Sequence, residues 1–182
     1  MTARQVTIKW RWLDWQPNYT WAKEIVPQLH DMGLQEQQLD HCVYVIRANG
    51  VFAIKYPKKA SPTLYIGEGN FKNRIMQHKN WLEPLRELVG DFYFQIGLCI
   101  PRVKNNYYAY KDFEAALLME FREIYGCAPL VNKQMENRHA EYKYVPRKEI
   151  RSALMIGKGI RYHWELVPKR SSPYYKCYWK TQ

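Results

Sequence analysis

Paired cysteines and long apolar runs are both missing from this sequence. The four cysteines of the 182-residue chain are widely scattered and form no C-x-x-C pair, so neither a disulfide framework nor a cysteine-based zinc site is expected. No apolar stretch approaches the roughly 18 residues that a membrane span needs. The N-terminal segment alternates in polarity and has no apolar core of a signal peptide. These absences predict a cytoplasmic protein with reduced thiols.

Positive charge is abundant and unevenly placed. The formal net charge is +11, of which +8 falls in residues 133–182, where tyrosines and tryptophans are interleaved with lysines and arginines. Such a segment suits a surface that neutralises phosphates and packs on sugars or bases. A solvated basic face with its aromatic rings turned inward would give the same pattern, and both interpretations stay open.

The most informative stretch is residues 42–78. Two apolar runs, 43–46 and 51–54, flank an Asn-Gly dipeptide that suits a type I′ turn, which predicts a β-hairpin. A third β-rich run ends at Gly67, and Asn70 is a good N-cap for a following helix. The segment therefore predicts strands that lead directly into a helix.

Four polar residues of this stretch are expected to meet. Arg74 and His78 are i and i+4 on the predicted helix, so they share one face. That face is expected to lie toward the strand ends that carry Tyr44 and Tyr65. Chemistry is therefore sought at these four side chains.

A second helix is expected over residues 111–126, with Asp112 as N-cap and Gly126 at its end. One apolar stripe is expected to face the core, and Glu120 falls in the middle of it. A buried carboxylate needs a cation, a metal or a proton as partner. Glu120 is therefore a candidate site residue.

Together these features resemble the catalytic module of the GIY-YIG endonucleases. The two family triplets align with residues 42–44 and 65–67, and the helix-borne arginine aligns with Arg74. The metal-binding glutamate aligns with Glu120, and the asparagine that follows a proline aligns with Asn132. Cysteine replaces the first glycine of the first triplet. The resemblance covers roughly residues 42–132.

The resemblance implies roles for these residues. Glu120 would hold one Mg²⁺ ion, for which Mn²⁺ can substitute, and Arg74 would neutralise the scissile phosphate. Tyr44 would be the general base, Tyr65 would position the water or the phosphate, and His78 would relay the tyrosine proton or act as the base itself. No small-molecule cofactor is implied.

Two further positions bear on the site. Asn132 would brace it, with a structural turn as the competing role. Glu68 directly follows the second triplet, where many family members carry lysine or another polar residue. A second acid there could support metal binding or weaken the approach of a phosphate, and the resemblance does not decide between them.

The expected fold is α+β, with a small three-stranded antiparallel sheet flanked by helices. Residues 42–132 would form the core, residues 1–41 an N-terminal strand and helix, and residues 133–182 a basic, aromatic-rich extension packed on the core, all in one compact domain. Residues 51–63 are interpreted as an insertion that extends the hairpin, with a lysine-bearing solvent loop as the alternative.

Several other elements are expected along the chain. Residues 6–12 alternate like a half-buried strand, and 20–32 are helical up to a break or kink at Pro27. A second short helix is expected over 81–89, after the one that carries Arg74. Residues 92–99 read as the third strand, and 100–111 as a loop.

The implied function is cleavage of DNA, expected to be double-stranded, by a stand-alone, type II restriction-like enzyme. Concerted cutting of both strands by a chain with one site implies a homodimer. A phage or mobile-element nicking nuclease and an inactive nucleic-acid-binding module are the alternatives. The candidate DNA contacts are Lys55, Lys58, Lys59, Lys72, Arg147, Lys148 and Arg151.

Overall fold

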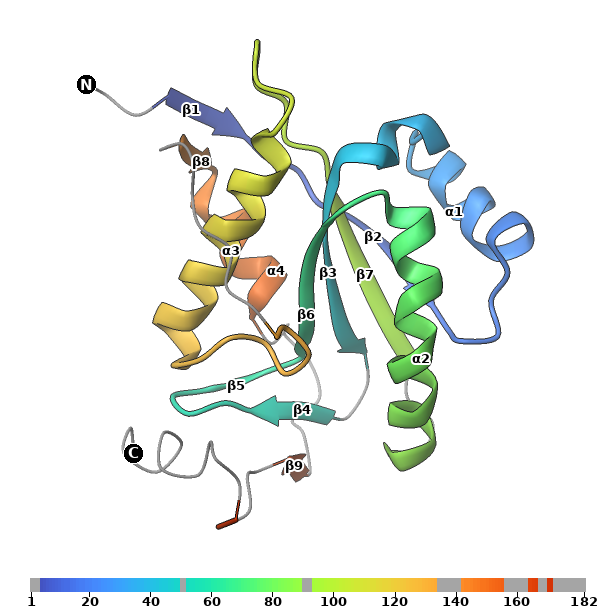
Figure 1. Ribbon diagram of the computed structural model, residues 1–182, viewed down its shortest axis with the longest axis vertical. Helices are drawn as coiled ribbons and strands as arrows, with labels where there is room; N and C mark the ends of the chain where they lie inside the picture. Colours follow the sequence, from blue (N-terminus) through green and yellow to red (C-terminus); the bar gives the residue numbers. More distant parts are fainter. Residues whose placement is uncertain are drawn as a thin grey trace.

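The computed structural model describes residues 4–49, 52–89, 93–133, 142–155, 164–166 and 170–171. The fold is mixed α+β, as expected. Its centre is a four-stranded antiparallel sheet with the strand order β2-β7-β3-β6 (Figure 1). These strands are β2 (Arg11–Trp15), β7 (Tyr93–Cys99), β3 (Cys42–Asn49) and β6 (Thr63–Gly69).

The inner strand β3 explains why the sheet is covered on both faces. Its first five residues, 42–46, are all buried, although successive side chains of a strand point to opposite faces. A continuous apolar run of this kind is typical of a strand that is enclosed on both sides. Tyr44 is therefore held by a strand that is packed on both faces.

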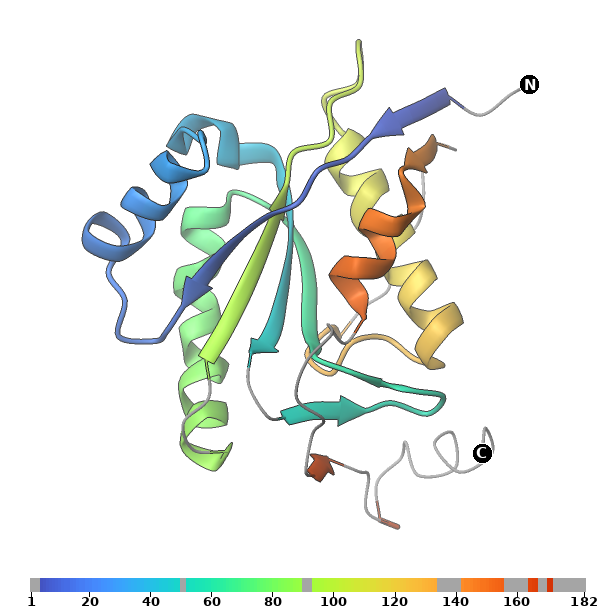
Figure 2. The same ribbon diagram turned by 180° about the vertical axis from the view of Figure 1, so that it is seen from behind.

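Helices lie on both sides of this sheet. In Figures 1 and 2, α3 and α4 lie together on one side, and α2 and α1 lie on the other. The α-helices are α1 (Val26–Asp31), α2 (Phe71–Val89), α3 (Ala109–Tyr125) and α4 (Arg147–Leu154). A π-helical turn, η1 (Trp21–Ile25), precedes α1, and a 3-10 helix, η2 (Glu36–His41), leads into β3.

Within the described residues, two smaller sheets accompany the central one. The first pairs β1 (Arg4–Thr7) in parallel with β8 (Tyr142–Val145). The second has the order β5-β4-β9 and consists of β4 (Phe52–Lys55), β5 (Ala60–Ser61) and β9 (Trp164–Leu166). Segments from both ends of the chain therefore join the body of the fold.

The predicted hairpin between residues 43–46 and 51–54 is wrong. Both edges of β3 are occupied by longer partners, β6 and β7, and β4 pairs instead with β5 and β9. Gly50 of the expected turn lies outside the described residues. The sheet has four strands rather than three because β2 pairs with the edge of β7 that β3 leaves open.

Of the other predicted helices and strands, some are confirmed and some are wrong. The third strand is confirmed as β7, and Gly126 ends α3 with a φ of 91°. The strand expected over 6–12 is divided between β1 and β2. The separate helix expected over 81–89 is wrong, because α2 continues through Pro84. Asn80, whose carbonyl loses its usual donor there, is exposed to solvent.

The N-terminal helical region agrees with the sequence pattern. Thr20 caps η1 by accepting a hydrogen bond from the Lys23 N–H, and α1 follows with Pro27 in its first turn. The polar stretch that follows forms the 3-10 helix η2, which begins at Glu36 and ends at His41. Within the described ranges, no helix is both long enough and apolar enough to cross a membrane.

Candidate active site

Tyr44 and His78 form the buried centre of a hydrogen-bonded cluster. The Tyr44 hydroxyl lies 2.8 Å from His78 Nε2, and Tyr44 is 0% exposed. β3 supplies the tyrosine, and α2 supplies the histidine from the turn that follows Arg74. The predicted meeting of the first strand and the helix is therefore observed.

Trp81 sets the direction of this hydrogen bond. Its indole Nε1, which can only donate, lies 3.0 Å from His78 Nδ1. Burial and the nearby Arg74 guanidinium lower the pKa of His78 from 6.5 to about 4, so the ring is neutral at pH 7. A neutral ring that accepts at Nδ1 carries its proton on Nε2. His78 therefore donates to the Tyr44 oxygen.

Arg74 joins the two motif tyrosines. Its Nη2 donates to the Tyr65 hydroxyl at 2.9 Å, and its Nε donates to the Tyr44 hydroxyl at 3.4 Å. Hydrogen bonding to Tyr44 raises the pKa of Arg74, so the guanidinium stays charged. Burial raises the pKa of Tyr44, and its hydrogen bond with Arg74 opposes that rise. The Tyr44 oxygen thus accepts from two donors, which offsets only part of the effect of burial, so Tyr44 stays a neutral phenol at pH 7.

Gly67 makes this close packing possible. It lies opposite Tyr44 in the β3–β6 register, so both positions are on the same face of the sheet. A Cβ at this position would lie 2.8 Å from the Tyr44 hydroxyl and still closer to the Tyr65 ring. Any side chain at residue 67 would therefore displace the two tyrosines.

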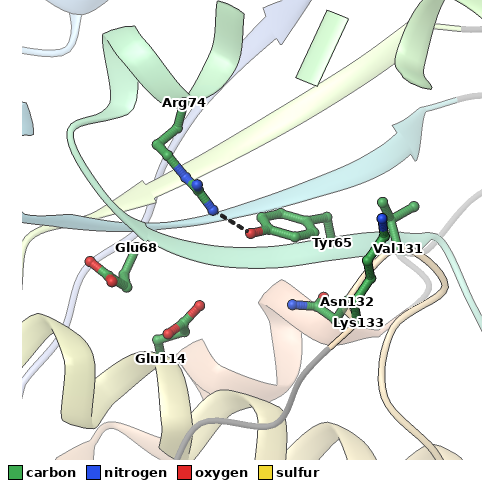
Figure 3. Close-up of a pocket in the computed structure, with 7 residues that line it drawn as sticks. All are labelled: Tyr65, Glu68, Arg74, Glu114, Val131, Asn132 and Lys133. Carbon is green, nitrogen blue, oxygen red and sulfur yellow. Dashed lines mark hydrogen bonds between the residues drawn. The ribbon is translucent and has the colours of Figure 1, made fainter. Parts of the chain in front are cut away.

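An open pocket of about 400 Å³ lies at the outer edge of β6, the last strand of the central sheet. Tyr65 and Arg74 line it from the α2 side, and Glu68 and Glu114 line it from the other side (Figure 3). Glu68 belongs to the opposite face of β6 from Tyr65, because strand side chains alternate. The pocket therefore gathers groups from both faces of an edge strand.

The tyrosines differ in their access to this pocket. Tyr65 lines the pocket and is 9% exposed, whereas Tyr44 lies behind it with its oxygen held by His78 and Arg74. Tyr65 is therefore the phenol that faces a ligand in the pocket. The role of Tyr44 as general base stays a prediction, and the tautomer of His78 leaves no acceptor nitrogen toward it.

Glu114 is the carboxylate that α3 contributes to the pocket, and the sequence analysis missed it. It is 6% exposed and lies across from Glu68 (Figure 3). Carboxylate oxygens are the ligands that Mg²⁺ prefers, so this pair fits such an ion. Among the described residues, no group of three or more histidine, cysteine, aspartate or glutamate side chains is placed to hold a metal. Phosphate oxygens and water would have to complete the coordination.

Glu120 is not brought to this pocket. Six residues along a helix amount to about 240° of rotation, so Glu120 points in another direction than Glu114. Its side chain is 11% exposed, and Arg147 of α4 lies 2.6 and 2.8 Å from its two oxygens. The cation that a largely buried carboxylate needs is therefore Arg147, which leaves the predicted metal-binding role of Glu120 without geometric support.

Asn132 braces the edge of β6. Its side-chain oxygen accepts from the Ile66 N–H at 2.9 Å, and its side-chain nitrogen donates to the Ile66 carbonyl at 2.7 Å. Its own N–H bonds to the Pro129 carbonyl at 3.0 Å, so it also closes a turn. Both roles weighed for this residue are thus present in the geometry. Lys133, which follows it, adds a cation to the pocket.

The candidate DNA-contacting lysines lie elsewhere on the surface. Lys58 donates to the Glu123 carbonyl at the end of α3, nine residues or about 14 Å along the helix from Glu114. Lys72 pairs with Glu36 at 3.4 Å. Among the described residues, Lys133 is the lysine that lines the pocket. Lys59, Lys148 and Arg151 are exposed and Lys55 is half-buried, and none of them lines it.

Much of the basic C-terminal segment lies outside the described residues, so its aromatic side chains from Tyr174 onward are not placed. Comparisons of the chain with protein-family models, with curated protein sequences and with solved structures gave no significant match. The functional argument therefore depends on the residues and their geometry.

Proposed function

We propose that the protein is a divalent-metal-dependent DNA endonuclease of the GIY-YIG type, in which β6, β3 and β7 form the expected three-stranded core. The observation that carries this proposal is the bridge from Arg74 to both motif tyrosines. A cation beside a phenol at the wall of an open pocket suits a phosphodiester, whose charge grows during hydrolysis.

Arg74 neutralises the scissile phosphate in this proposal. Two phenol oxygens hold its guanidinium in place, so little reorganisation is needed when charge develops. Tyr65 orients the attacking water or a phosphate oxygen at the pocket wall. Tyr44 and His78 form the buried support that fixes Arg74, with His78 donating to Tyr44.

Glu114, with Glu68 opposite, is the better candidate than Glu120 for holding the divalent ion. Such an ion, when bound, would stabilise the negative charge of the reacting phosphate. Glu68 and Glu114 line the same pocket as Arg74 and Tyr65, whereas Glu120 does not line it and pairs with Arg147. Lys133 at the rim adds positive charge for the DNA backbone.

The biological setting is a separate part of the proposal. One such site per chain cuts one strand, so a restriction-like enzyme would act as a homodimer on double-stranded DNA. A nicking nuclease of a phage or mobile element would act as a monomer. An inactive nucleic-acid-binding module would have no need of a carboxylate pair beside Arg74, which favours an enzyme.

Supercoiled plasmid with Mg²⁺ or with a chelator tests the proposal. Cleavage is expected with Mg²⁺ alone, and Glu114→Gln should lower it by about 100-fold or more. Glu120→Gln, on the same helix, should keep most of the activity. Greater loss with Glu120→Gln than with Glu114→Gln would restore the assignment made from the sequence. Several DNAs that are bound but never cut would identify a binding module.

A further inference from the structure

A second open pocket, of about 440 Å³, lies at the end of the central sheet where β3 begins and β7 ends. The loop before α3, residues 100–108, forms much of its wall, and the rest comes from Tyr110 and from Gln37, Gln38 and His41 of η2. The rings of His41 and Tyr110 meet edge to face at 4.9 Å. None of the functional residues considered above belongs to this wall.

The loop exposes two neighbouring aromatic rings to solvent. Tyr107 is 87% exposed and Tyr108 is 64% exposed. Large rings displayed in this way contribute little to a core, and exposed aromatic side chains are what nucleic-acid-binding proteins use to stack unpaired bases. The Lys111 ammonium lies 5.5 Å from the centre of the Tyr108 ring, which adds a cation beside the stacking surface.

The charged side chains that the loop itself carries are all positive. Residues 100–111 contain Arg102, Lys104 and Lys111 and no aspartate or glutamate. All three side chains are exposed. A surface with three cations beside two exposed aromatic rings matches a single strand of nucleic acid, which offers phosphates and unstacked bases together.

The loop is held in its shape by hydrogen bonds. The Asn106 side chain accepts from the Tyr108 N–H at 2.9 Å and donates to the Tyr142 hydroxyl at 2.7 Å. The Asn106 N–H also closes a turn onto the Val103 carbonyl at 3.1 Å. The tyrosines are therefore presented on a braced loop, which lowers the entropy cost of binding.

This surface adjoins the candidate active site. Tyr110 lines the second pocket, and Glu114 of the first pocket is one helical turn further along α3. Val43, two residues after His41 of the second pocket, also pairs with Glu68 of the first pocket in the β3–β6 register, so the two pockets lie close together. A strand held at Tyr107 can therefore continue toward Arg74.

We infer that the loop surface formed by Arg102, Lys104, Tyr107, Tyr108 and Lys111 binds an unpaired nucleic-acid segment next to the cleaved bond. This rests on the proposed function for the position of the bond, but binding itself requires no cleavage. The substrate would then be DNA with a single-stranded or opened region beside the cut, rather than only a continuous duplex.

Fluorescence anisotropy with a labelled single-stranded oligonucleotide, in a chelator, measures this binding without cleavage. The double substitution Tyr107→Ala and Tyr108→Ala should weaken binding at least about tenfold, because each stacked base contributes about 1–3 kcal/mol. Tyr107→Phe with Tyr108→Phe should bind like the wild type, since stacking needs no hydroxyl. Tyr93→Ala, at another exposed tyrosine, should also bind normally.

Heparin separates base stacking from simple charge, because it is a polyanion without bases. The double alanine variant should bind heparin like the wild type, and an equal loss on heparin and DNA would overturn the inference. Substituting Arg102, Lys104 and Lys111 by Gln should lower the salt dependence of oligonucleotide binding by about two in the log–log slope. An unchanged slope, or alanine-variant affinity within twofold of wild type, would also overturn it.

The plasmid assay keeps this inference distinct from the proposed function. Stacking-dependent binding without any cleavage would support the binding surface and contradict the proposed nuclease function. If the tyrosine substitutions left cleavage of both duplex and gapped DNA unchanged, the nuclease function would be supported and the binding surface contradicted.

Discussion

The two sides of β6 differ in how the chain builds them. On the α2 side, Tyr44, Tyr65, Arg74 and His78 come from a single stretch and are joined by hydrogen bonds. On the α3 side, Glu114 comes from a helix far along the chain and meets Glu68 only through tertiary packing. The difference teaches that a local stretch can specify half of a site, while the other half depends on the rotation of a distant helix.

The largest effect is expected from breaking the α2 side at Arg74. Arg74→Ala should lower cleavage by about 100- to 1000-fold, because it removes the preorganised donor for the phosphate and frees both tyrosines. Arg86→Ala is the matched control, at the other end of α2 and about 18 Å away along the helix. Single-turnover cleavage rates measure both variants.

A small effect of Arg74→Ala on the cleavage rate would contradict the catalytic role of the α2 side of β6. The hydrogen bonds on that side would then serve only to stabilise the fold. In that outcome the Glu114 side alone would carry the chemistry. An effect on folding instead of cleavage would appear as a lower midpoint of urea unfolding in Arg74→Ala than in Arg86→Ala.

The α2 side of β6 could be predicted from the sequence, whereas the strand pairing and the α3 side could not. The spacing of Arg74 and His78 and the alternation along β3 and β6 are local rules, and they place four residues together. The predicted hairpin was wrong because strand pairing depends on distant segments as well as on the local turn. Both β6 and β7 are longer than β4 and pair with β3 instead.

The α3 carboxylate could not be chosen from the pattern alone. Ten of the 17 residues of α3 are buried, Asp112 and Glu114 among them, so burial extends around most of the helix instead of following one apolar stripe. Glu114 and Glu120 then look alike in the sequence. Only the packing of α4 shows that Glu120 meets Arg147, while Glu114 turns toward the edge of β6.

A smaller loss of cleavage rate is expected from Trp81→Phe, which tests the hydrogen bond from Trp81 to His78 on the α2 side. The ring is kept and the donor to His78 Nδ1 is lost, so His78 can place its proton on either nitrogen. Cleavage should slow by about tenfold, the value of one hydrogen bond of about 1.4 kcal/mol. The ¹⁵N chemical shifts of the His78 ring report the tautomer directly.

Trp21→Phe is the matched control for Trp81→Phe. Trp21 donates its indole N–H to Glu36 at 2.7 Å, outside the cluster around Tyr44. Its removal should leave the His78 shifts and the cleavage rate as they are in the wild type. Unchanged His78 shifts in Trp81→Phe would show that another group fixes the tautomer.

The smallest effect is expected from His78→Gln, which asks whether His78 is a donor or a base. The glutamine amide can donate to Tyr44 and accept from Trp81, so a donor role predicts cleavage within a few fold of wild type, whereas a role as base predicts loss of cleavage.

The free energy of unfolding should also depend on pH through His78. Because the pKa of His78 falls from 6.5 to about 4 on folding, the unfolded chain binds the extra proton between these values. The free energy of unfolding therefore drops as pH falls through this window. Urea unfolding at pH 7 and pH 5 should show a smaller drop for His78→Gln, and an equal drop would place the acid sensitivity elsewhere.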